Sequence, residues 1–239
     1  MTTFAVIEVP HRFGDIATNL AWIDGVLSKA RADVVLLPEA SLTGYVSPRG
    51  DFDLSRFAEP IDGPLSVAMA ERARRFGVHL GWPLVERDAG RCFNTYCIHA
   101  PDGRRLVRYR KRHPWFPEVW ATPGDEPHPV FEIAGLRATL AICYDVHFLA
   151  KGAKEALAES DALLFPSAWV EAEGEIDARR DLFFDLSRVY RVGIVNSNWG
   201  PGDVVMPGQG SSRIVGPDGH EVMRMTSGAF ATGALGRKA

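Results

Sequence analysis

A short buried strand that ends at a cysteine constrains this chain more than any other feature of its sequence. Residues 138–142 are small, apolar or β-branched and contain no Gly or Pro, which is typical of a strand buried on both faces. Cys143 follows directly, and the polar residues Tyr144 and Asp145 come before a helix-forming segment over 148–160. The pattern predicts a buried strand that passes into a helix, with the cysteine at the junction.

A thiol at such a junction has two interpretations. At a helix N-terminus the positive end of the dipole lowers the pKa of a cysteine from about 8.5 to roughly 3.5–7.5, which raises the fraction of reactive thiolate. A single cysteine in an apolar run is, however, more often a small core residue than a nucleophile. Catalysis by Cys143 therefore depends on what the rest of the chain supplies.

The composition is that of an ordinary globular protein. The chain has 239 residues, 46% of them hydrophobic and 24% charged, and no linker, charge block or repeat divides it, so we expect one domain over residues 1–239. A net charge of −3 with scattered arginines gives no basic face for nucleic acid and no polybasic membrane anchor. The N-terminus has no positive start followed by a long apolar segment, so we expect a cytoplasmic protein without a membrane partner.

The cysteines indicate neither disulfides nor a metal. Cys92, Cys97 and Cys143 are too few and odd in number for a disulfide framework. No paired CxxC or HExxH spacing is present, so no metal site is predicted.

Strands and helices alternate along most of the chain. Strands are expected at 4–9, 34–37, 79–86, 92–99, 105–111, 129–134, 137–143, 162–165, 192–196, 211–215, 221–225 and 228–235, and helices at about 15–30, 65–76, 148–160 and 176–190. The last helix has Leu182, Leu186 and Val189 in register, and 112–129 is a proline-rich and aromatic loop. Mixed βαβ units and hairpins with helices to cover both sheets predict a layered α/β domain.

Two charged side chains share the location of Cys143 at the end of a strand. Glu39 follows VVLLP and Lys111 follows LVRYR, and sites in α/β sheets form at the carboxyl ends of strands. The carboxylate can take the thiol proton and return it to a leaving amine, while the ammonium stabilises an oxyanion. Glu118, in the aromatic loop, adds a second carboxylate that can hold the substrate nitrogen or water. Taken singly, each is better explained as a solvated charge.

Five segments around these residues resemble the carbon-nitrogen hydrolase (nitrilase) superfamily. They are LLPEASLTGY around Glu39, FNTYCIHAPDGRRLVRYRKRH around Lys111, TPGDEPHPVFE, LAICYDVHF around Cys143, and GSSRIVGPDGHEV. The resemblance runs almost end to end, with three motifs in the family's order and approximate spacing. It implies a four-layer αββα sandwich, catalysis without cofactor or metal, and a homodimer or larger homo-oligomer.

The resemblance also implies a role for each residue of the set. Cys143 is the nucleophile, and Glu39 is the general base and acid. Lys111 stabilises the oxyanion together with the backbone N–H of Tyr144, and Glu118 matches the family's supporting second glutamate.

Two further segments point to different branches of the family, so no subfamily is assigned. The loop RKRHPWFPEVWATPG is most similar to that of aliphatic amidases and formamidases, whereas FPSAW at 165–169 is similar to the branch of pantetheinase and biotinidase. His147 stands where many members carry Arg. The role that this Arg has in shaping the site of those members is therefore in doubt for this chain.

Aromatic residues near the motifs are candidates for an acyl pocket, although Trp is equally a core residue. The predicted substrate-binding residues are Tyr45, Trp115, Tyr144 and Trp169, with Trp120 and Trp199 as further candidates. A substrate carboxylate could be held by Arg112, Arg179 or Arg180, but solvated surface charge explains each of them better. For His113 and His147, structural hydrogen bonding is the better explanation.

These observations predict an amidohydrolase that acts on small linear amides. It would cleave a non-peptide C–N bond through a cysteine thioester and release a carboxylic acid with ammonia or an amine. The same triad could instead hydrolyse a nitrile or an N-carbamoyl group, or pass the acyl group to an amine. A non-catalytic binding homologue is a further alternative, against which the intact triad argues. A redox role for Cys143 would require a resolving cysteine, which the sequence does not place beside it.

Overall fold

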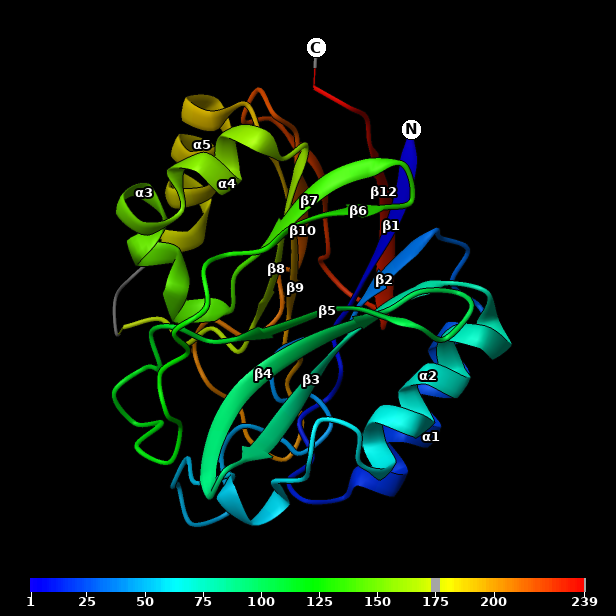
Figure 1. Cartoon of the computed structure of the whole chain (residues 1–239), viewed down its shortest axis with the longest axis vertical. Helices are drawn as coiled ribbons and strands as arrows, with labels where there is room; N and C mark the ends of the chain where they lie inside the picture. Colours follow the sequence, from blue (N-terminus) through cyan, green and yellow to red (C-terminus); the bar gives the residue numbers. More distant parts are fainter. Residues whose placement is uncertain (173–176, 239) are drawn as a thin grey trace.

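Two six-stranded sheets form the centre of the molecule in the computed structural model, which describes residues 1–172 and 177–238 (Figure 1). The first sheet has the order β12-β1-β2-β3-β4-β5. Its strands are β1 (Thr2–Ile7), β2 (Val34–Leu36), β3 (His79–Asp88), β4 (Arg91–His99), β5 (Arg105–Arg110) and β12 (Phe230–Leu235). β1, β2 and β3 are parallel, and the other three run antiparallel to their neighbours. The predicted meander of β3, β4 and β5 is confirmed.

The second sheet has the order β11-β10-β9-β8-β7-β6. Its strands are β6 (Val130–Ile133), β7 (Leu136–Leu140), β8 (Ala162–Ser167), β9 (Gly193–Asn198), β10 (Arg213–Val215) and β11 (Glu221–Arg224). β7, β8 and β9 are parallel and central, and hairpin strands extend the sheet on both sides. Because β7 and β8 are parallel neighbours, the segments that follow them emerge at the same edge of the sheet.

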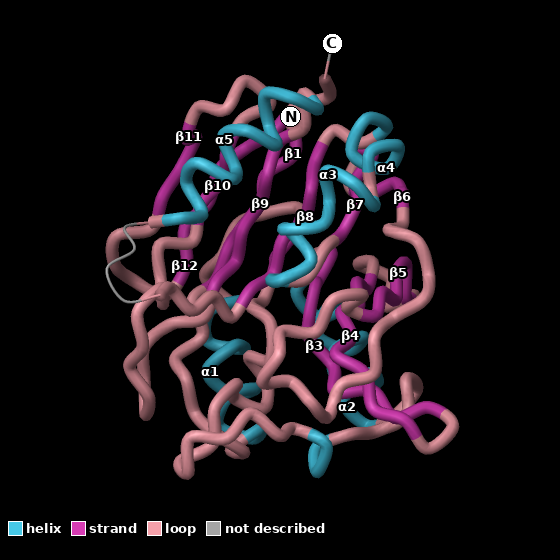
Figure 2. The backbone as a smooth tube through the Cα atoms, turned by 90° about the vertical axis from the view of Figure 1, so that its left-hand side faces the viewer, coloured by secondary structure: helices cyan, strands magenta, loops and turns pink. Residues whose placement is uncertain are grey.

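Helices cover the outer face of each sheet. α1 (Ile16–Leu27) and α2 (Pro64–Phe76) lie on the first sheet, and α3 (Leu149–Gly152), α4 (Lys154–Glu159) and α5 (Ala178–Tyr190) lie over the second (Figures 1 and 2). Asp15 caps α1 by accepting a hydrogen bond from the Thr18 N–H at 3.1 Å. α2 begins at Pro64, one residue before the predicted start, and is capped after Phe76 by Gly77, whose φ of 65° suits a residue without a side chain.

The central core lies between the sheets. Alternate residues of β1 point in opposite directions: Phe4 and Val6 pack with β7 and β8, whereas Ala5 and Ile7 pack with α1 and α2. β2 divides its residues in the same way. This period of two requires a helix layer on one face and a second sheet on the other. The predicted four-layer αββα sandwich is therefore confirmed.

The structure differs from the prediction at two helices. A continuous helix over 148–160 does not form: the 3₁₀ helix η2 (Cys143–Phe148), α3 and α4 follow one another, and α3 ends at Gly152, a poor helix former. In α5 the buried stripe runs through Arg179, Phe183 and Leu186, so Val189, predicted to be in register, is 71% exposed.

The predicted start of the last helix, at Ile176, lies outside the described residues. A second 3₁₀ helix, η1 (Ser55–Phe57), lies in the loop before α2. Within the described residues, every helix is too short or too polar to cross a membrane.

Candidate active site

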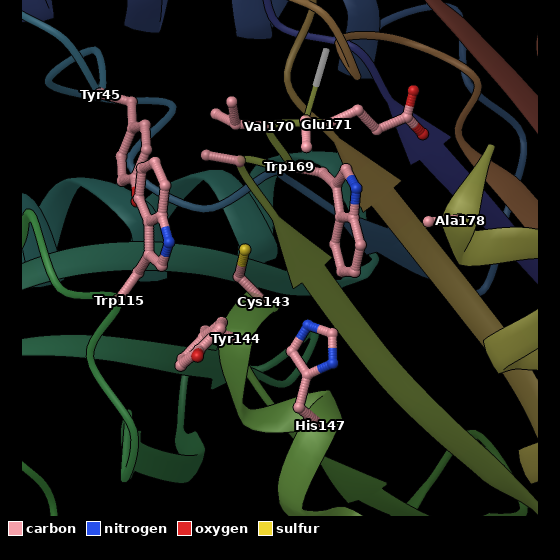
Figure 3. A pocket seen from close by; sticks show the side chains of 11 residues that line it. Tyr45, Trp115, Cys143, Tyr144, His147, Trp169, Val170, Glu171 and Ala178 are labelled. Atoms are coloured by element: carbon pink, nitrogen blue, oxygen red, sulfur yellow. The ribbon is translucent and has the colours of Figure 1, made fainter. Parts of the chain in front are cut away.

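The backbone holds Cys143 in a left-handed conformation at the start of η2. Its φ is 44°, and Ala40, directly after Glu39, has a φ of 51°. Such conformations cost non-glycine residues about 1–3 kcal/mol each, cluster at functional sites, and persist because the surrounding structure fixes them. Figure 3 shows the sulfur of Cys143 pointing into a cavity between aromatic side chains.

Lys111 lies between two buried carboxylates. Its Nζ donates to Glu39 Oε1 at 2.8 Å and to Glu118 Oε2 at 2.7 Å, and all three side chains are fully buried. Burial alone would lower the pKa of the Lys111 ammonium, but the charges of Glu118 and Glu39 outweigh it and raise that pKa. The lysine is therefore held as a cation, and the predicted residues Glu39, Lys111 and Glu118 are brought together.

Asn94, a residue of β4, completes this cluster and was missed from the sequence. Its side-chain amide donates to Glu39 Oε1 at 2.7 Å and to Glu118 Oε1 at 2.9 Å. The backbone N–H of Ala168, just after β8, donates to Glu39 Oε2 at 2.8 Å. The sequence indicated Asn94 only through its position in the FNTY segment, which is part of a family-like motif. The two glutamates are thus fixed by donors from three different segments.

The electrostatics of the thiol contradict the expected low pKa. Burial, followed by the charge of Glu39, raises the pKa of Cys143 well above its usual value, and Glu118 adds to this. Lys111 and the N–H of Ala168 act in the opposite direction but do not compensate. The helix-dipole argument was wrong because η2 is a short 3₁₀ helix and because two carboxylates face one ammonium. At neutral pH the resting cysteine is a thiol, so its attack requires a base.

Asp145 ties the turn of Cys143 to the segment that follows Lys111, and the sequence indicated only a turn-former there. Its carboxylate is fully buried. It accepts hydrogen bonds from the Tyr109 hydroxyl at 2.8 Å and from the backbone N–H groups of Ile142, Arg112 and His113 at 3.2, 3.1 and 2.8 Å. His113 Nδ1 lies 3.0 Å from the same carboxylate. The Asp145 side chain therefore positions both the turn that carries Cys143 and the segment that follows Lys111.

Asp145→Asn is expected to lower kcat for any amide that the protein hydrolyses by about 10–100-fold, with a smaller change in KM. Asparagine keeps the shape but loses the charge and one acceptor oxygen, and small displacements of reacting groups cost about 10²-fold. Steady-state ammonia release measures both constants. Tyr109→Phe removes a single hydrogen bond to the same carboxylate and should have the smaller effect. An unchanged kcat in a folded Asp145→Asn variant would contradict the positioning role.

A cavity of about 340 Å³ opens above the sulfur of Cys143 (Figure 3). It is lined by Tyr45, Trp115, Cys143, Tyr144, His147, Ala168, Trp169, Val170, Glu171, Ala172 and Ala178. All four predicted substrate-binding residues are in this set, although their contact with substrate stays a prediction. Trp120 and Trp199 are not among the described lining residues, and the Trp199 indole instead donates to the Trp169 carbonyl at 2.8 Å. The cavity is within the range of ligand sites, at its small end.

The arginines and histidines near the motifs separate into distinct environments. Arg179, expected on the solvated surface, is only 2% exposed, and its guanidinium donates to the carbonyls of Gly208 and Gly210 at 3.2 and 3.1 Å. Arg180 is exposed and pairs with Asp181. His113 stacks on Phe148 with ring centroids 3.9 Å apart, whereas His147 lines the cavity beside Tyr144 and Trp169.

Comparison with known proteins identifies a family and related sequences. The family model for carbon-nitrogen hydrolases matches residues 3–229. A hydrolase encoded in the pqqF 5' region of Pseudomonas protegens is 31% identical over 168 residues, which are 69% of this chain and 58% of that protein. The omega-amidase NIT2 of Bos taurus is 29% identical over 184 residues, which are 71% of this chain and 65% of that protein. The aligned part thus spans about three fifths of these relatives.

Solved structures share the fold over nearly the whole chain. The amidase NitN from Nesterenkonia sp. AN1 superposes with a TM-score of 0.84 at 23% identity, covering 99% of this chain and 93% of its own. A CN-hydrolase superfamily protein from Xanthomonas campestris gives a TM-score of 0.83 at 21% identity, covering 98% and 90%. The solved structures show the shared fold, and the family match over residues 3–229 shows that this chain belongs to the carbon-nitrogen hydrolase family.

Proposed function

We propose that this protein is an amidase that hydrolyses small linear amides through a thioester on Cys143. One observation carries the proposal. A buried Lys111 ammonium is shared by Glu39 and Glu118 directly beside a cysteine that faces an aromatic cavity. This set holds a base, a cation and a nucleophile in one water-poor site, which is what acyl transfer from an amide requires.

The first half of the proposed reaction forms the thioester. Glu39 takes the proton of Cys143 as the sulfur bonds to the amide carbonyl carbon, and the carbonyl oxygen becomes an oxyanion. Two of the three N–H groups of Lys111 are used by the glutamates, which leaves one for the oxyanion, alongside the backbone N–H of Tyr144. The C–N bond then breaks as Glu39 returns the proton to the leaving nitrogen.

The second half releases the acid. Glu39 takes a proton from water, the hydroxide oxygen bonds to the thioester carbon, and the C–S bond breaks. The thiolate recovers a proton from Glu39, so the residues end as they began. Glu118, held by Asn94 and Lys111, orients the amide nitrogen and later the water.

Known amidase structures support this assignment by analogy. A variant of the Nesterenkonia sp. AN1 amidase carries the acetamide moiety of fluoroacetamide covalently on its active-site cysteine. Another variant of that enzyme has been solved in complex with butyramide. An unbranched amide of this size suits a cavity of about 340 Å³.

Incubation with primary amides, nitriles and N-carbamoyl compounds tests the proposal. We expect ammonia release from short amides, with an intact mass increase equal to the acyl group in rapidly quenched samples. Cys143→Ala, the control, should show neither. Turnover of nitriles or N-carbamoyl compounds alone would replace the amidase assignment by one of the sequence-based alternatives. No turnover of any compound by folded protein would contradict hydrolysis.

A further inference from the structure

The cavity above Cys143 continues beyond the catalytic residues along the indole of Trp169. In Figure 3, Glu171 and Ala178 lie on the side of Trp169 away from Cys143. Both residues line the same cavity as the sulfur. An acyl chain bound at Cys143 can therefore extend past Trp169, and its far end meets Glu171.

Glu171 gives this end of the cavity a negative charge. Among the described lining residues, Glu171 carries the one carboxylate, and there is no Lys or Arg. The carboxylate is partly exposed and makes no close ion pair within the described residues, while at longer range its charge interacts with the Arg179 guanidinium. Deeper in the site, Glu39 and Glu118 face the single ammonium of Lys111. The charges that a substrate meets are thus mainly negative.

Arg179 lies behind Trp169 and does not line the described cavity. The Arg179 guanidinium lies 5.9 Å from the ring of Trp169, and it donates to the side chain of Asn196 and to the carbonyls of Gly208 and Gly210. Burial and the neighbouring Arg213 lower the pKa of Arg179 to about 10, so it stays charged at neutral pH. It is 2% exposed, joins α5 to the 208–210 loop and is not among the described lining residues of the cavity.

The wall between Cys143 and Glu171 also favours a cation. In Figure 3, Trp169 lies between these two residues, and the face of an indole ring attracts an ammonium group. A substrate carboxylate would meet this ring and the Glu171 charge unfavourably.

We propose that the substrate of this site is an ω-amino amide, with the amide carbonyl at Cys143 and a terminal ammonium group at Trp169 and Glu171. The inference rests on the proposed amidase function. A preference for amides that carry a terminal carboxylate would instead require a cation at the position of Glu171.

Amides matched in length and different in terminal charge test this inference. The series has two, three or four methylenes after the carbonyl and ends in a methyl, an ammonium or a carboxylate group. At low salt we expect kcat/KM for the best ammonium compound to exceed that of its carboxylate counterpart at least tenfold and that of its methyl counterpart at least threefold. Salt should reduce the preference, because partly exposed charges are screened.

Variants of Glu171 sharpen the test. Glu171→Gln should lower the ammonium-to-methyl ratio of kcat/KM at least threefold, and Glu171→Lys should invert the ammonium-to-carboxylate preference. Asp181→Asn removes a negative charge that is exposed on α5 outside the cavity, so it should leave all ratios unchanged. Ratios in Glu171→Gln equal to those of the unsubstituted protein would overturn the inference. A preference for the carboxylate series would also overturn it and would point to Arg179.

Binding separates this inference from the proposed function. Calorimetry with Cys143→Ala, which retains the cavity, should show tighter binding of ammonium than of carboxylate amides even if the protein turns over neither. Turnover of all three series at equal rates would leave the amidase function standing and remove the charge preference. Equal binding to Cys143→Ala would remove it as well.

Discussion

Cys143→Ala is expected to reduce ammonia release from amides to the uncatalysed background. In the proposed reaction the cysteine supplies the atom that bonds to the carbonyl carbon, and removing the nucleophile of a catalytic set costs about as much as removing the whole set. Cys143→Ser keeps a nucleophilic oxygen but should also be inactive, because the hydroxyl is a far weaker nucleophile than the thiol in this environment. Residual activity above about 1% in either variant would show that the thioester is not on the pathway.

The same cysteine should be slow to react with iodoacetamide at neutral pH. Burial and Glu39 raise its pKa, so the thiolate fraction at pH 7 is smaller than that of a free cysteine. Alkylation should therefore be slower than that of a free thiol, and its rate should continue to rise with pH beyond the range in which a free thiol is fully ionised. Mass spectrometry of the labelled peptide measures both. Fast alkylation at pH 7 would contradict the thiol state inferred for the resting site.

Slow alkylation is compatible with catalysis, because the proposed base, Glu39, lies within the site and can deprotonate the thiol during the reaction. Activation of the thiol by a helix dipole was one of two interpretations of the sequence, and it used local order alone. The actual charge balance arises from Glu39, Lys111 and Glu118, which come from distant parts of the chain. An amide bound at the sulfur allows Glu39 to take the proton as the C–S bond forms, so a permanently ionised thiolate is unnecessary.

Three of the four residues predicted to be catalytic share one property: they follow strands, whereas Glu118 lies in the loop between β5 and β6. Glu39 and Cys143 follow β2 and β7 within a few residues, and Lys111 follows β5, so a reading of strand ends found them. Asn94 lies inside β4 and Asp145 lies inside η2, where a polar residue has no position that sets it apart. Their roles depend on which carboxylates and N–H groups the tertiary fold places opposite them.

The errors in the helices have a related cause. Leu182, Leu186 and Val189 fit a helical stripe, but the helix buries Arg179 and Phe183 together with Leu186 and leaves Val189 exposed. The Arg179 guanidinium finds carbonyl acceptors in the 208–210 loop. Arg179 was predicted to be solvated because burying an arginine without hydrogen-bond acceptors costs a large amount of free energy. Periodicity thus located α5, whereas its rotation about its own axis was set by partners from β9 and the following loop.

Lys111→Met is expected to destabilise the protein by about 3–5 kcal/mol and to lower kcat at least 10²–10³-fold. Removing one partner of a buried ion pair leaves its partner charges uncompensated, and here two carboxylates, Glu39 and Glu118, would face each other without the ammonium. The oxyanion also loses a donor, a loss that typically costs 10²–10³-fold in rate. Urea unfolding and steady-state ammonia release measure the two effects separately.

The destabilisation should depend on pH in a direction that the structure fixes. Burial already raises the pKa of Glu118, while Lys111 lowers it, so this pKa rises further in Lys111→Met. A carboxyl whose pKa is raised in the folded state binds its proton more tightly there than in the unfolded chain, so folding is favoured as the pH falls. The stability difference from the unsubstituted protein should therefore shrink between pH 7 and pH 5.

The double variant Lys111→Met with Glu118→Gln separates stability from chemistry. It removes one carboxylate along with the ammonium, so it should recover much of the lost stability while staying inactive, and the non-additivity measures the Lys111–Glu118 coupling directly. Recovery of activity together with stability would show that Lys111 only neutralises Glu118. Glu118→Gln alone is the control, because it shows how much activity is lost with that carboxylate. A stable double variant that is much less active than Glu118→Gln would assign the ammonium to the oxyanion.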